Sequence, residues 1–240
     1  MNGLALCAGI GGLELGIAAA VPGYRAACYV EREGYAASVL ATRMEAGDLS
    51  PAPIYSDLRT FDGRPWRRVV DLVSAGYPCQ PFSLAGIRRG SDDPRHLWPH
   101  VFRIIREVRP RFVCLENVPG HLSMGFGDVL GDLASEGFNA EWGVFSAASV
   151  GAPHLRKRVF ILAHSNGQGR QGRRRPTRQE ESEPGGNGVG GWREAPSSVG
   201  RLDDGVPHRV DRLRCLGNAV VPAQAALAFR TLIARARESL

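Results

Sequence analysis

The sequence predicts an α/β fold in which a mostly parallel, twisted sheet is flanked by helices. Two observations support this prediction. Over residues 1–165, short apolar runs alternate with amphipathic stretches, as is typical of βαβ units. The chain has 240 residues and is 43% hydrophobic, so it can form one complete α/β core, with or without a small appendage.

The N-terminal elements form the first of these units. An apolar run predicts a strand, glycines predict a tight turn directly after it, and an amphipathic stretch ending near Pro22 predicts a helix. A second strand and a second helix follow. In order, the expected elements are a strand at 3–8, a turn at 9–12, a helix at 13–20, a strand at 24–31 and a helix at about 33–45.

The central part of the chain continues the alternation. The apolar run 69–74 predicts a strand that leads into the proline-rich loop 76–81, and residues 94–108 have the apolar periodicity of a helix. Residues 112–116 and 159–163 are largely apolar and are expected to form buried strands.

The composition changes abruptly after His164. From Ser165 to about Asp204 the chain is rich in Gly, Arg, Glu, Ser and Pro and lacks apolar periodicity, which predicts a loop-rich or partly disordered segment. A closing helix is expected at 222–237. We therefore predict one main domain, formed by residues 1–164 and 214–240, and a short inserted segment, 165–213.

Composition also bounds the function. The chain has no run of eighteen apolar residues and no signal-peptide pattern, so we expect a cytoplasmic protein. Its five cysteines are odd in number, widely spaced and without a CxxC pair, which argues against a disulfide framework or a zinc site, and no metal is expected. The net charge of +6 suggests an acidic partner such as nucleic acid, although 29 arginines against one lysine also fit a GC-rich genome.

The glycine turn at 9–12 has the features of a nucleotide site. Glycine lets a ligand approach the backbone closely, and the following helix presents free N–H groups, although a plain tight turn would use the same residues. Glu31, at the end of the second strand, can hold ribose hydroxyls, and Asp57, after a presumed third strand, can meet an adenine edge. Each acid alone could be a surface residue, but together they favour an adenosine-containing cofactor.

Cys79 and Glu116 indicate the chemistry. Both follow a predicted strand, so both belong at the carboxyl edge of the sheet, where ligands of open α/β folds bind. A lone cysteine is usually a buried apolar residue, but Pro78 and Pro81 stiffen the loop around Cys79 and fix the direction of its thiol. A thiol beside a carboxyl can act on an electron-poor ring: the thiol adds, and the carboxyl protonates or hydrogen-bonds a ring nitrogen.

Five segments then carry a family resemblance: Leu-Cys-Ala-Gly-Ile-Gly-Gly at 6–12, Pro-Cys-Gln at 78–80, Glu-Asn-Val at 116–118, His-Leu-Arg-Lys-Arg-Val-Phe at 154–160 and Gly-Asn-Ala-Val-Val-Pro at 217–222. In this order they resemble the cofactor, nucleophile, acid, Gln-x-Arg-x-Arg and closing Gly-Asn motifs of the cytosine-C5 DNA methyltransferases. The resemblance spans nearly the whole chain. It implies a Rossmann-like S-adenosylmethionine-dependent methyltransferase fold with a reduced target-recognition segment, here 165–213.

The resemblance also implies the reaction. The Cys79 thiolate would add to C6 of a cytosine flipped out of duplex DNA, Glu116 would engage N3 and the exocyclic amine, and Arg156 and Arg158 would hold the base or its phosphate. C5 would then take the methyl group of S-adenosyl-L-methionine, after which the C5 proton and Cys79 would leave. The residues implied at the cofactor are Cys7, Gly9, Ile10, Gly11, Gly12, Glu31, Asp57, Leu58, Pro78, Leu97, Asn218 and Ala219.

The chain departs from the family pattern at two positions. Cys7 replaces the usual aromatic residue, which removes a stacking surface beside the cofactor, and His154 replaces the usual Gln. The short recognition segment either folds minimally on DNA, has low specificity or is supplemented by another protein. The expected DNA contacts are Gln80, Ser83, Arg173, Arg174, Arg175, Trp192 and Arg193, although the basic cluster 170–178 also fits a solvated linker.

Two alternative functions stay open on the sequence. One is a tRNA cytosine-C5 methyltransferase, because relatives of this family act on RNA. The other is a catalytically silent DNA-binding relative, in which either the loss of the recognition element or the changes at Cys7 and His154 have abolished turnover. The family suggests a monomer, and it allows a restriction endonuclease partner and a bacterial or phage source.

Overall fold

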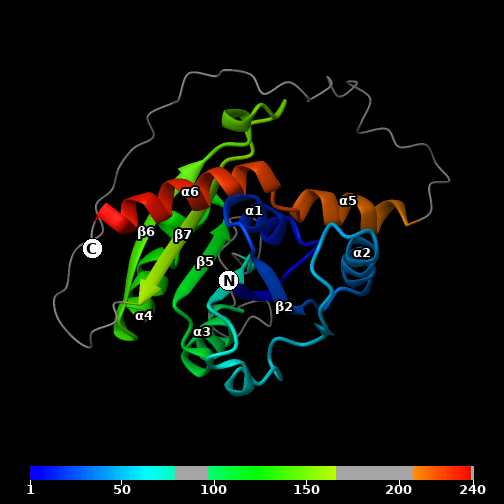
Figure 1. Cartoon of the computed structure of the whole chain (residues 1–240). Coiled ribbons are helices and arrows are strands. Elements are labelled where there is room, and N and C mark those ends of the chain that lie inside the picture. Colours follow the sequence, from blue (N-terminus) through cyan, green and yellow to red (C-terminus); the bar gives the residue numbers. More distant parts are fainter. Residues whose placement is uncertain (79–96, 166–207, 239–240) are drawn as a thin grey trace.

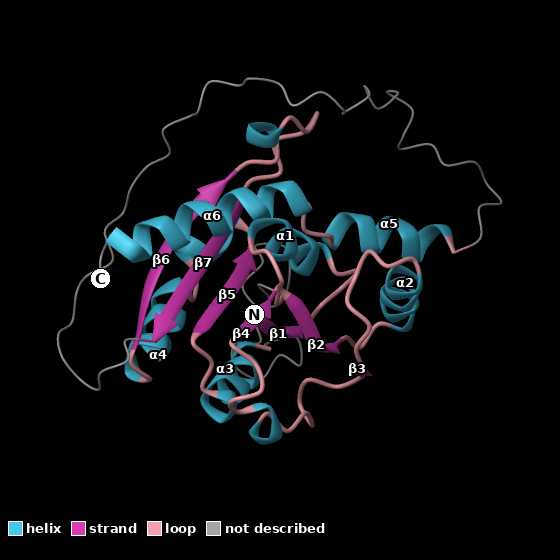
Figure 2. Ribbon diagram, viewed as in Figure 1, coloured by secondary structure: helices cyan, strands magenta, loops and turns pink. Residues whose placement is uncertain are grey.

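The computed structural model describes residues 1–78, 97–165 and 208–238, and its centre is a seven-stranded sheet with helices on both faces (Figures 1 and 2). The strand order is β3-β2-β1-β4-β5-β7-β6, and among these strands β7 alone runs opposite to the other six. The predicted α/β fold with a mostly parallel sheet is therefore confirmed. The strands are β1 (Asn2–Leu6), β2 (Arg25–Val30), β3 (Ile54–Tyr55), β4 (Leu72–Ala75), β5 (Phe112–Asn117), β6 (Phe138–Phe145) and β7 (Arg158–Ser165).

Helices cover the two faces of the sheet unequally. The described α-helices are α1 (Gly12–Ala20), α2 (Gly34–Glu45), α3 (Trp98–Val108), α4 (Phe126–Ser135), α5 (Arg209–Asn218) and α6 (Pro222–Glu238). Short 3₁₀ turns occur at Arg64–Trp66, Pro119–Ser123 and Ala148–Val150. Helices α3 and α4 pack on one face, whereas α1, α2 and α6 pack on the other.

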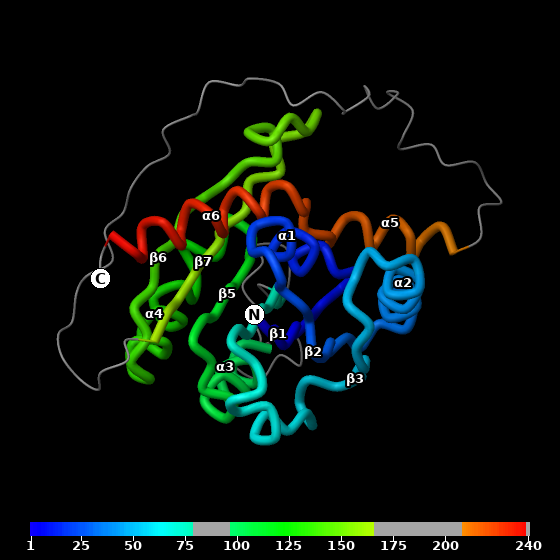
Figure 3. Tube along the Cα trace, viewed as in Figure 1, coloured from blue at the N-terminus to red at the C-terminus, as the bar shows by residue number. Residues whose placement is uncertain are grey.

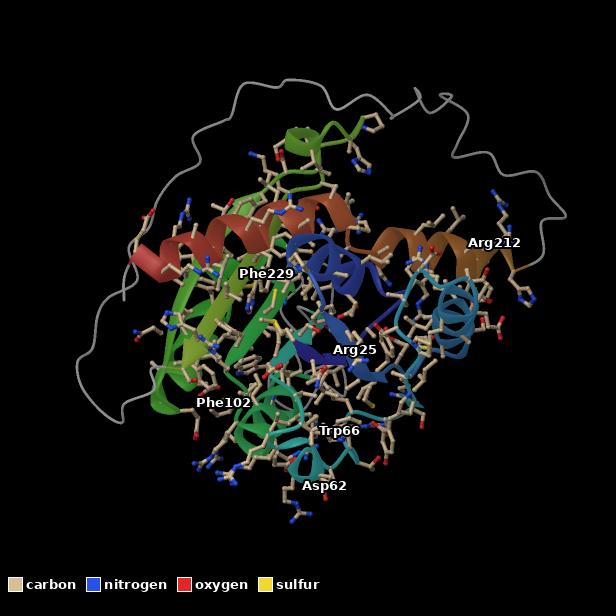
Figure 4. The ribbon with its side chains drawn as sticks, in the orientation of Figure 1. Arg25, Asp62, Trp66, Phe102, Arg212 and Phe229 are labelled. Atoms are coloured by element: carbon tan, nitrogen blue, oxygen red, sulfur yellow. The ribbon has the colours of Figure 1, made fainter. Side chains whose placement is uncertain are left out.

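The strands read as continuous apolar runs because both of their faces are buried. In β1, Leu4 and Leu6 point into the core beneath α3 and α4, and Ala5 between them points into the opposite core beneath α2. Phe229 of α6, labelled in Figure 4, belongs to the core that α6 shares with α1. This double burial holds the strand ends rigidly in place, which positions the site.

The C-terminal helices return to the N-terminal part of the chain. Figure 3 shows α6, in red, beside α1, in blue, although about 200 residues separate them. By length and composition, the stretch Arg209–Glu238 could span a membrane. It is divided into α5 and α6 by residues 219–221, however, and α6 buries its apolar side chains against α1, β6 and β7. In contrast, α5 has no buried residue, and its Arg212 points away from the sheet (Figure 4).

Candidate active site

A cavity of about 860 Å³ lies at the carboxyl ends of β1, β2, β4 and β5. This is the edge where open α/β sheets bind ligands, and the volume suits a ligand of nucleoside size. Of the twelve residues expected at the cofactor, all but Gly11 line this cavity. Gly11 precedes α1 and faces Leu40 and Leu49 instead.

The glycine turn at the end of β1 is held by Glu31. Gly9 adopts a left-handed conformation with φ 55°, and its N–H donates to Oε2 of Glu31 at 2.7 Å. The other carboxylate oxygen of Glu31, Oε1, accepts the N–H of Glu33 at 2.8 Å. Because each carboxylate oxygen has two lone pairs, Glu31 can brace the turn and still accept hydroxyl groups from a ligand.

Asp57 and its neighbours form the part of the cavity wall that lies near the carboxyl ends of β2 and β3. Asp57 lines the cavity and forms an ion pair with Arg59, from Oδ2 to Nη2, at 2.9 Å. The hydrogen bond from the Arg59 guanidinium is the main reason that the pKa of Asp57 is lowered to about 2. Leu58, which is buried, and Leu97 add apolar surface to the same wall. A flat apolar ring with polar edges fits this combination.

Glu116 is the buried acid of the cavity. It lies near the end of β5, is 8% exposed, and its Oε1 is 2.9 Å from Nε of Arg158, at the start of the neighbouring strand β7. Burial raises the pKa of Glu116 from 4.5 to about 7, and the charges of Arg158 and Arg156 act in the opposite direction. Near neutral pH this carboxyl can therefore either donate or accept a proton.

Hydrogen bonds hold the start of the loop that follows β4 beside Glu116. Nδ2 of Asn117 donates to the carbonyl of Tyr77 at 3.1 Å, and a Cβ placed on Gly76 would lie 3.4 Å from Oε2 of Glu116. The hydroxyl of Tyr77 hydrogen-bonds Nε2 of His121 at 3.1 Å. No local sequence pattern predicts these contacts, because they join residues about 40 apart. Pro78 completes the described part of this loop and lines the cavity.

Several expected site residues lie outside the described part of the chain. These are Cys79, Gln80, Ser83, Arg173, Arg174, Arg175, Trp192 and Arg193. The roles expected of them, including nucleophilic attack by Cys79, stay predictions. So do the proposed boundaries of the segment 165–213, within which helix α5 already begins at Arg209.

The cysteines that the structure describes are poor nucleophiles. Burial raises the pKa of Cys7 to about 12 and that of Cys28 to about 11, and it also raises the pKa values of Cys114 and Cys215. All four are free thiols. Because the reactive form of cysteine is the thiolate, a raised pKa lowers the reactivity of these four side chains at neutral pH. Cys7, which lines the cavity, therefore contributes contact surface there.

The two arginines of segment 154–160 have different partners. Arg158 contacts Glu116, as described above, whereas Arg156 donates through Nη2 to the carbonyls of Gly217 and Ala219, at 2.7 and 2.6 Å. Arg156 and His154 line a smaller cavity, of about 260 Å³, behind the glycine turn. Asn218, the last residue of α5, and Ala219, directly after it, line the larger cavity.

Sequence reasoning did not single out Glu14, a second buried acid at the cavity. It is in the first turn of α1, is 2% exposed, and its Oε1 accepts the hydroxyl of Ser74 at 2.8 Å. Its Oε2 has no hydrogen-bond partner among the described residues. Burial raises the pKa of Glu14 to about 7. Glu14 thus joins the helix after the glycine turn to β4, the strand before the Cys79 loop.

Comparison with known proteins identifies relatives of this chain. The family model "C-5 cytosine-specific DNA methylase" matches residues 1–198. The chain is 35% identical over 167 residues to the Type II methyltransferase M.NgoMIV of Neisseria gonorrhoeae, covering 68% of this chain and 51% of that protein. It is 32% identical over 183 residues to M.AquIA of Picosynechococcus sp., covering 69% of this chain and 72% of that protein.

The fold is shared with solved structures as well. DNMT2 from Spodoptera frugiperda superposes with a TM-score of 0.60 at 20% identity, covering 76% of this chain and 56% of that one. At this identity the similarity concerns the fold alone. The chain spans about half the length of M.NgoMIV and of the superposed structure.

Proposed function

The chain belongs to the C-5 cytosine-specific DNA methylase family, and from that premise we propose that it transfers a methyl group from S-adenosylmethionine to C5 of a cytosine in duplex DNA. The observation that carries this proposal is the placement of Glu116. An acid with a pKa near 7, paired with Arg158, lines a cavity that also contains the glycine turn. A site of this kind can bind an adenosine cofactor and an electron-poor ring side by side.

The residues of the cavity fit S-adenosylmethionine. Carboxylate oxygens of Glu31 and Asp57 are suitable acceptors for ribose hydroxyls and an adenine amine, and Leu58 and Leu97 supply apolar surface for the ring. Asn218 adds an amide to the opposite wall. When bound, the cofactor supplies an electrophilic methyl group. The chain's own residues then have to make C5 of cytosine nucleophilic.

Glu116 and Cys79 would activate the ring together. The Cys79 thiolate forms a bond to C6, while the protonated Glu116 gives a hydrogen bond or a proton to N3, so that the electron pair of the former C5–C6 double bond becomes available at C5. After C5 is methylated, its proton leaves to a base and the C6–S bond breaks, which restores the C5–C6 double bond and the free thiolate. Any proton given to N3 then returns to Glu116. Arg158 holds the Glu116 carboxyl beside the base.

Two features of the substrate follow from this mechanism. C6 is not accessible within a stacked duplex, so the cytosine has to be flipped out, at a cost of roughly a few kcal/mol. A thiol with a reference pKa of about 8.5 is only slightly ionised at neutral pH, so a neighbouring cation or the bound substrate assists the ionisation of Cys79. We also propose Gln80, Ser83, Trp192, Arg193 and Arg173–Arg175 as DNA contacts, and a monomeric enzyme.

The experiment that tests the function measures transfer of a tritiated methyl group from the cofactor to duplex DNA and, in parallel, to tRNA. We expect incorporation into DNA by the wild type and none by Cys79→Ser. Incorporation into tRNA alone would establish the RNA alternative, and equal counts from wild type and Cys79→Ser would exclude both enzymatic functions. Bisulfite sequencing of DNA from an expressing host then gives the target sequence.

A further inference from the structure

The guanidinium of Arg156 binds the C-terminal end of α5 and the residue that follows it. Its Nη2 donates to two carbonyls, those of Gly217 and Ala219, at 2.7 and 2.6 Å. These carbonyls flank Asn218, and all three residues, at the end of α5 and directly after it, line the larger cavity. One charged nitrogen therefore binds two of the residues that the C-terminal segment contributes to the cavity wall. Hydrogen bonds from a charged donor are stronger than neutral ones.

The backbone of Arg156 is attached to the same C-terminal segment. Gln224 of α6 is fully buried, and its Nε2 donates to the carbonyls of Arg156 and Phe145, at 2.9 and 2.8 Å. Arg156 has φ 33°, in the left-handed region that residues other than glycine seldom adopt. A strained conformation of this kind persists only where the surroundings impose it, and here they do so from both the backbone and the side chain.

Segment 217–220, which Arg156 binds, also packs directly on the glycine turn at 9–12. A Cβ placed on Gly12 would lie 2.3 Å from the carbonyl oxygen of Val220, so the backbone after Ala219 passes over the start of α1 without space for a side chain between them. Displacing residues 217–220 would therefore open the cavity on the side of the glycine turn. The hydrogen bonds of Arg156 therefore help to determine the position of residues 217–220 relative to the glycine turn.

We propose that Arg156 is a positioning residue for the cofactor: it holds the wall formed by residues 217–220 in place against the glycine turn. This role rests on the proposed use of S-adenosylmethionine, and it differs from the contact with the base that the family resemblance implies. Arg158, two residues further along, forms an ion pair with the acid Glu116 instead. Within segment 156–158, Arg156 thus supports the cavity wall formed by residues 217–220, and Arg158 supports Glu116, the acid that activates the base.

The test compares Arg156→Met with Arg158→Met and with a matched control, Arg230→Met. Arg230 of α6 also donates through Nη2 to a carbonyl, that of Ala19, at 2.6 Å, but on the outer side of α1 away from the cavity. The binding of S-adenosylhomocysteine to DNA-free protein is measured by calorimetry. We expect the Kd of Arg156→Met to rise about tenfold, because part of the binding free energy would then be spent on ordering residues 217–220, and that of Arg230→Met to stay unchanged.

Steady-state kinetics separates positioning from catalysis. Arg156→Met should raise the KM for the cofactor with kcat nearly unchanged, whereas Arg158→Met should lower kcat. If Arg156→Met does not fold, Arg156→Lys takes its place, with an expected rise in Kd of a few-fold. An unchanged Kd together with a lower kcat would overturn the inference and restore a base contact for Arg156. If the wild type itself binds no S-adenosylhomocysteine, the proposed function fails first, and this inference fails with it.

Discussion

Glu116 and Arg158 form an ion pair of 2.9 Å that bridges β5 and β7, the two strands where the sheet changes from parallel to antiparallel. Both side chains are largely buried, with 11% and 17% of their side-chain surface exposed. The pKa of Glu116 is nevertheless about 7, because desolvation outweighs the attraction of the two nearby arginines. The site thus has a proton donor that works at neutral pH.

Replacement of the acid should separate catalysis from cofactor binding. We expect Glu116→Gln to lower kcat for methyl transfer about 100-fold or more, because the amide cannot protonate the ring, while the Kd for S-adenosylhomocysteine changes little. Glu136→Gln is the matched control, since it removes a carboxyl that pairs with Arg106 at the same distance, 2.9 Å, outside the cavity. Equal rates for Glu116→Gln and Glu136→Gln would exclude Glu116 from the chemistry.

The pH profile tests the electrostatic role of Arg158. The protonated form of Glu116 is the active one in the proposed mechanism, so its contribution to kcat/KM is lost as the pH rises through about 7. Arg158 lowers the pKa of Glu116, so Arg158→Met should move this alkaline limb to higher pH while also lowering the maximum rate. Lys157→Met, at an exposed neighbouring position, should leave the limb in place. A limb that moves to lower pH in Arg158→Met would contradict this account.

Glu14 should make the protein less stable at high pH. The pKa of Glu14 rises from its ordinary value of 4.5 to about 7 in the folded protein, where the carboxyl is buried and one oxygen has no hydrogen-bond partner within residues 1–78, 97–165 and 208–238. The folded state therefore binds a proton more strongly, so this contribution to stability is complete below about pH 4.5 and is lost as the pH rises through 7. At its largest the contribution is about 3 kcal/mol.

Urea unfolding at pH 5 and pH 8 measures this effect. Glu14→Gln keeps the acceptor for Ser74 and has no charge to bury, so its free energy of unfolding should fall less between the two pH values than that of the wild type. Glu45→Gln, at an exposed position on α2, is the control and should behave like the wild type. A pH dependence that is the same in Glu14→Gln and wild type would show that Glu14 is ionised without penalty.

The close approach at Gly12 gives a prediction about packing. Gly12→Ala would place a methyl group 2.3 Å from the backbone carbonyl of Val220, so we expect a loss of about 1–3 kcal/mol in the free energy of unfolding and weaker cofactor binding. Gly34→Ala is the matched control, because it is also the first residue of a helix but its Cβ would meet nothing within 4 Å. Thermal unfolding of both variants decides the point, and equal stability would refute the close contact.

The strands that could be predicted from sequence are those buried on both faces. Residues 112–116 are apolar up to Glu116 and residues 159–163 are apolar throughout, and the structure extends both segments only slightly, to β5 and β7. Strand β6 was not predicted because its sequence, Phe-Asn-Ala-Glu-Trp-Gly-Val-Phe, lies at the sheet edge and mixes polar and apolar residues. The antiparallel direction of β7 has no local signal, because it depends on how the chain crosses the sheet.

The candidate site divides in the same way. The positions of Glu31, Asp57 and Glu116 at the cavity follow from one rule, that parallel strands bring their carboxyl ends to one edge. Contacts between distant residues escaped prediction, such as that of Arg156 with Gly217 and that of Glu14 with Ser74, each about 60 residues apart. Local sequence patterns do not predict which residues come into contact once α6 packs on α1.

The most direct test of the account is to trap the covalent bond between Cys79 and its substrate. Duplex DNA with 5-fluorocytosine at the target position can be attacked at C6 and methylated at C5, but fluorine cannot leave as the proton does, so the thiol cannot be eliminated. We predict a stable adduct that requires S-adenosylmethionine, with mass spectrometry locating the modified peptide at Cys79 and with no adduct in Cys79→Ser. An adduct at another cysteine, or methylation of ordinary DNA by Cys79→Ser at the wild-type rate, would contradict the proposed mechanism.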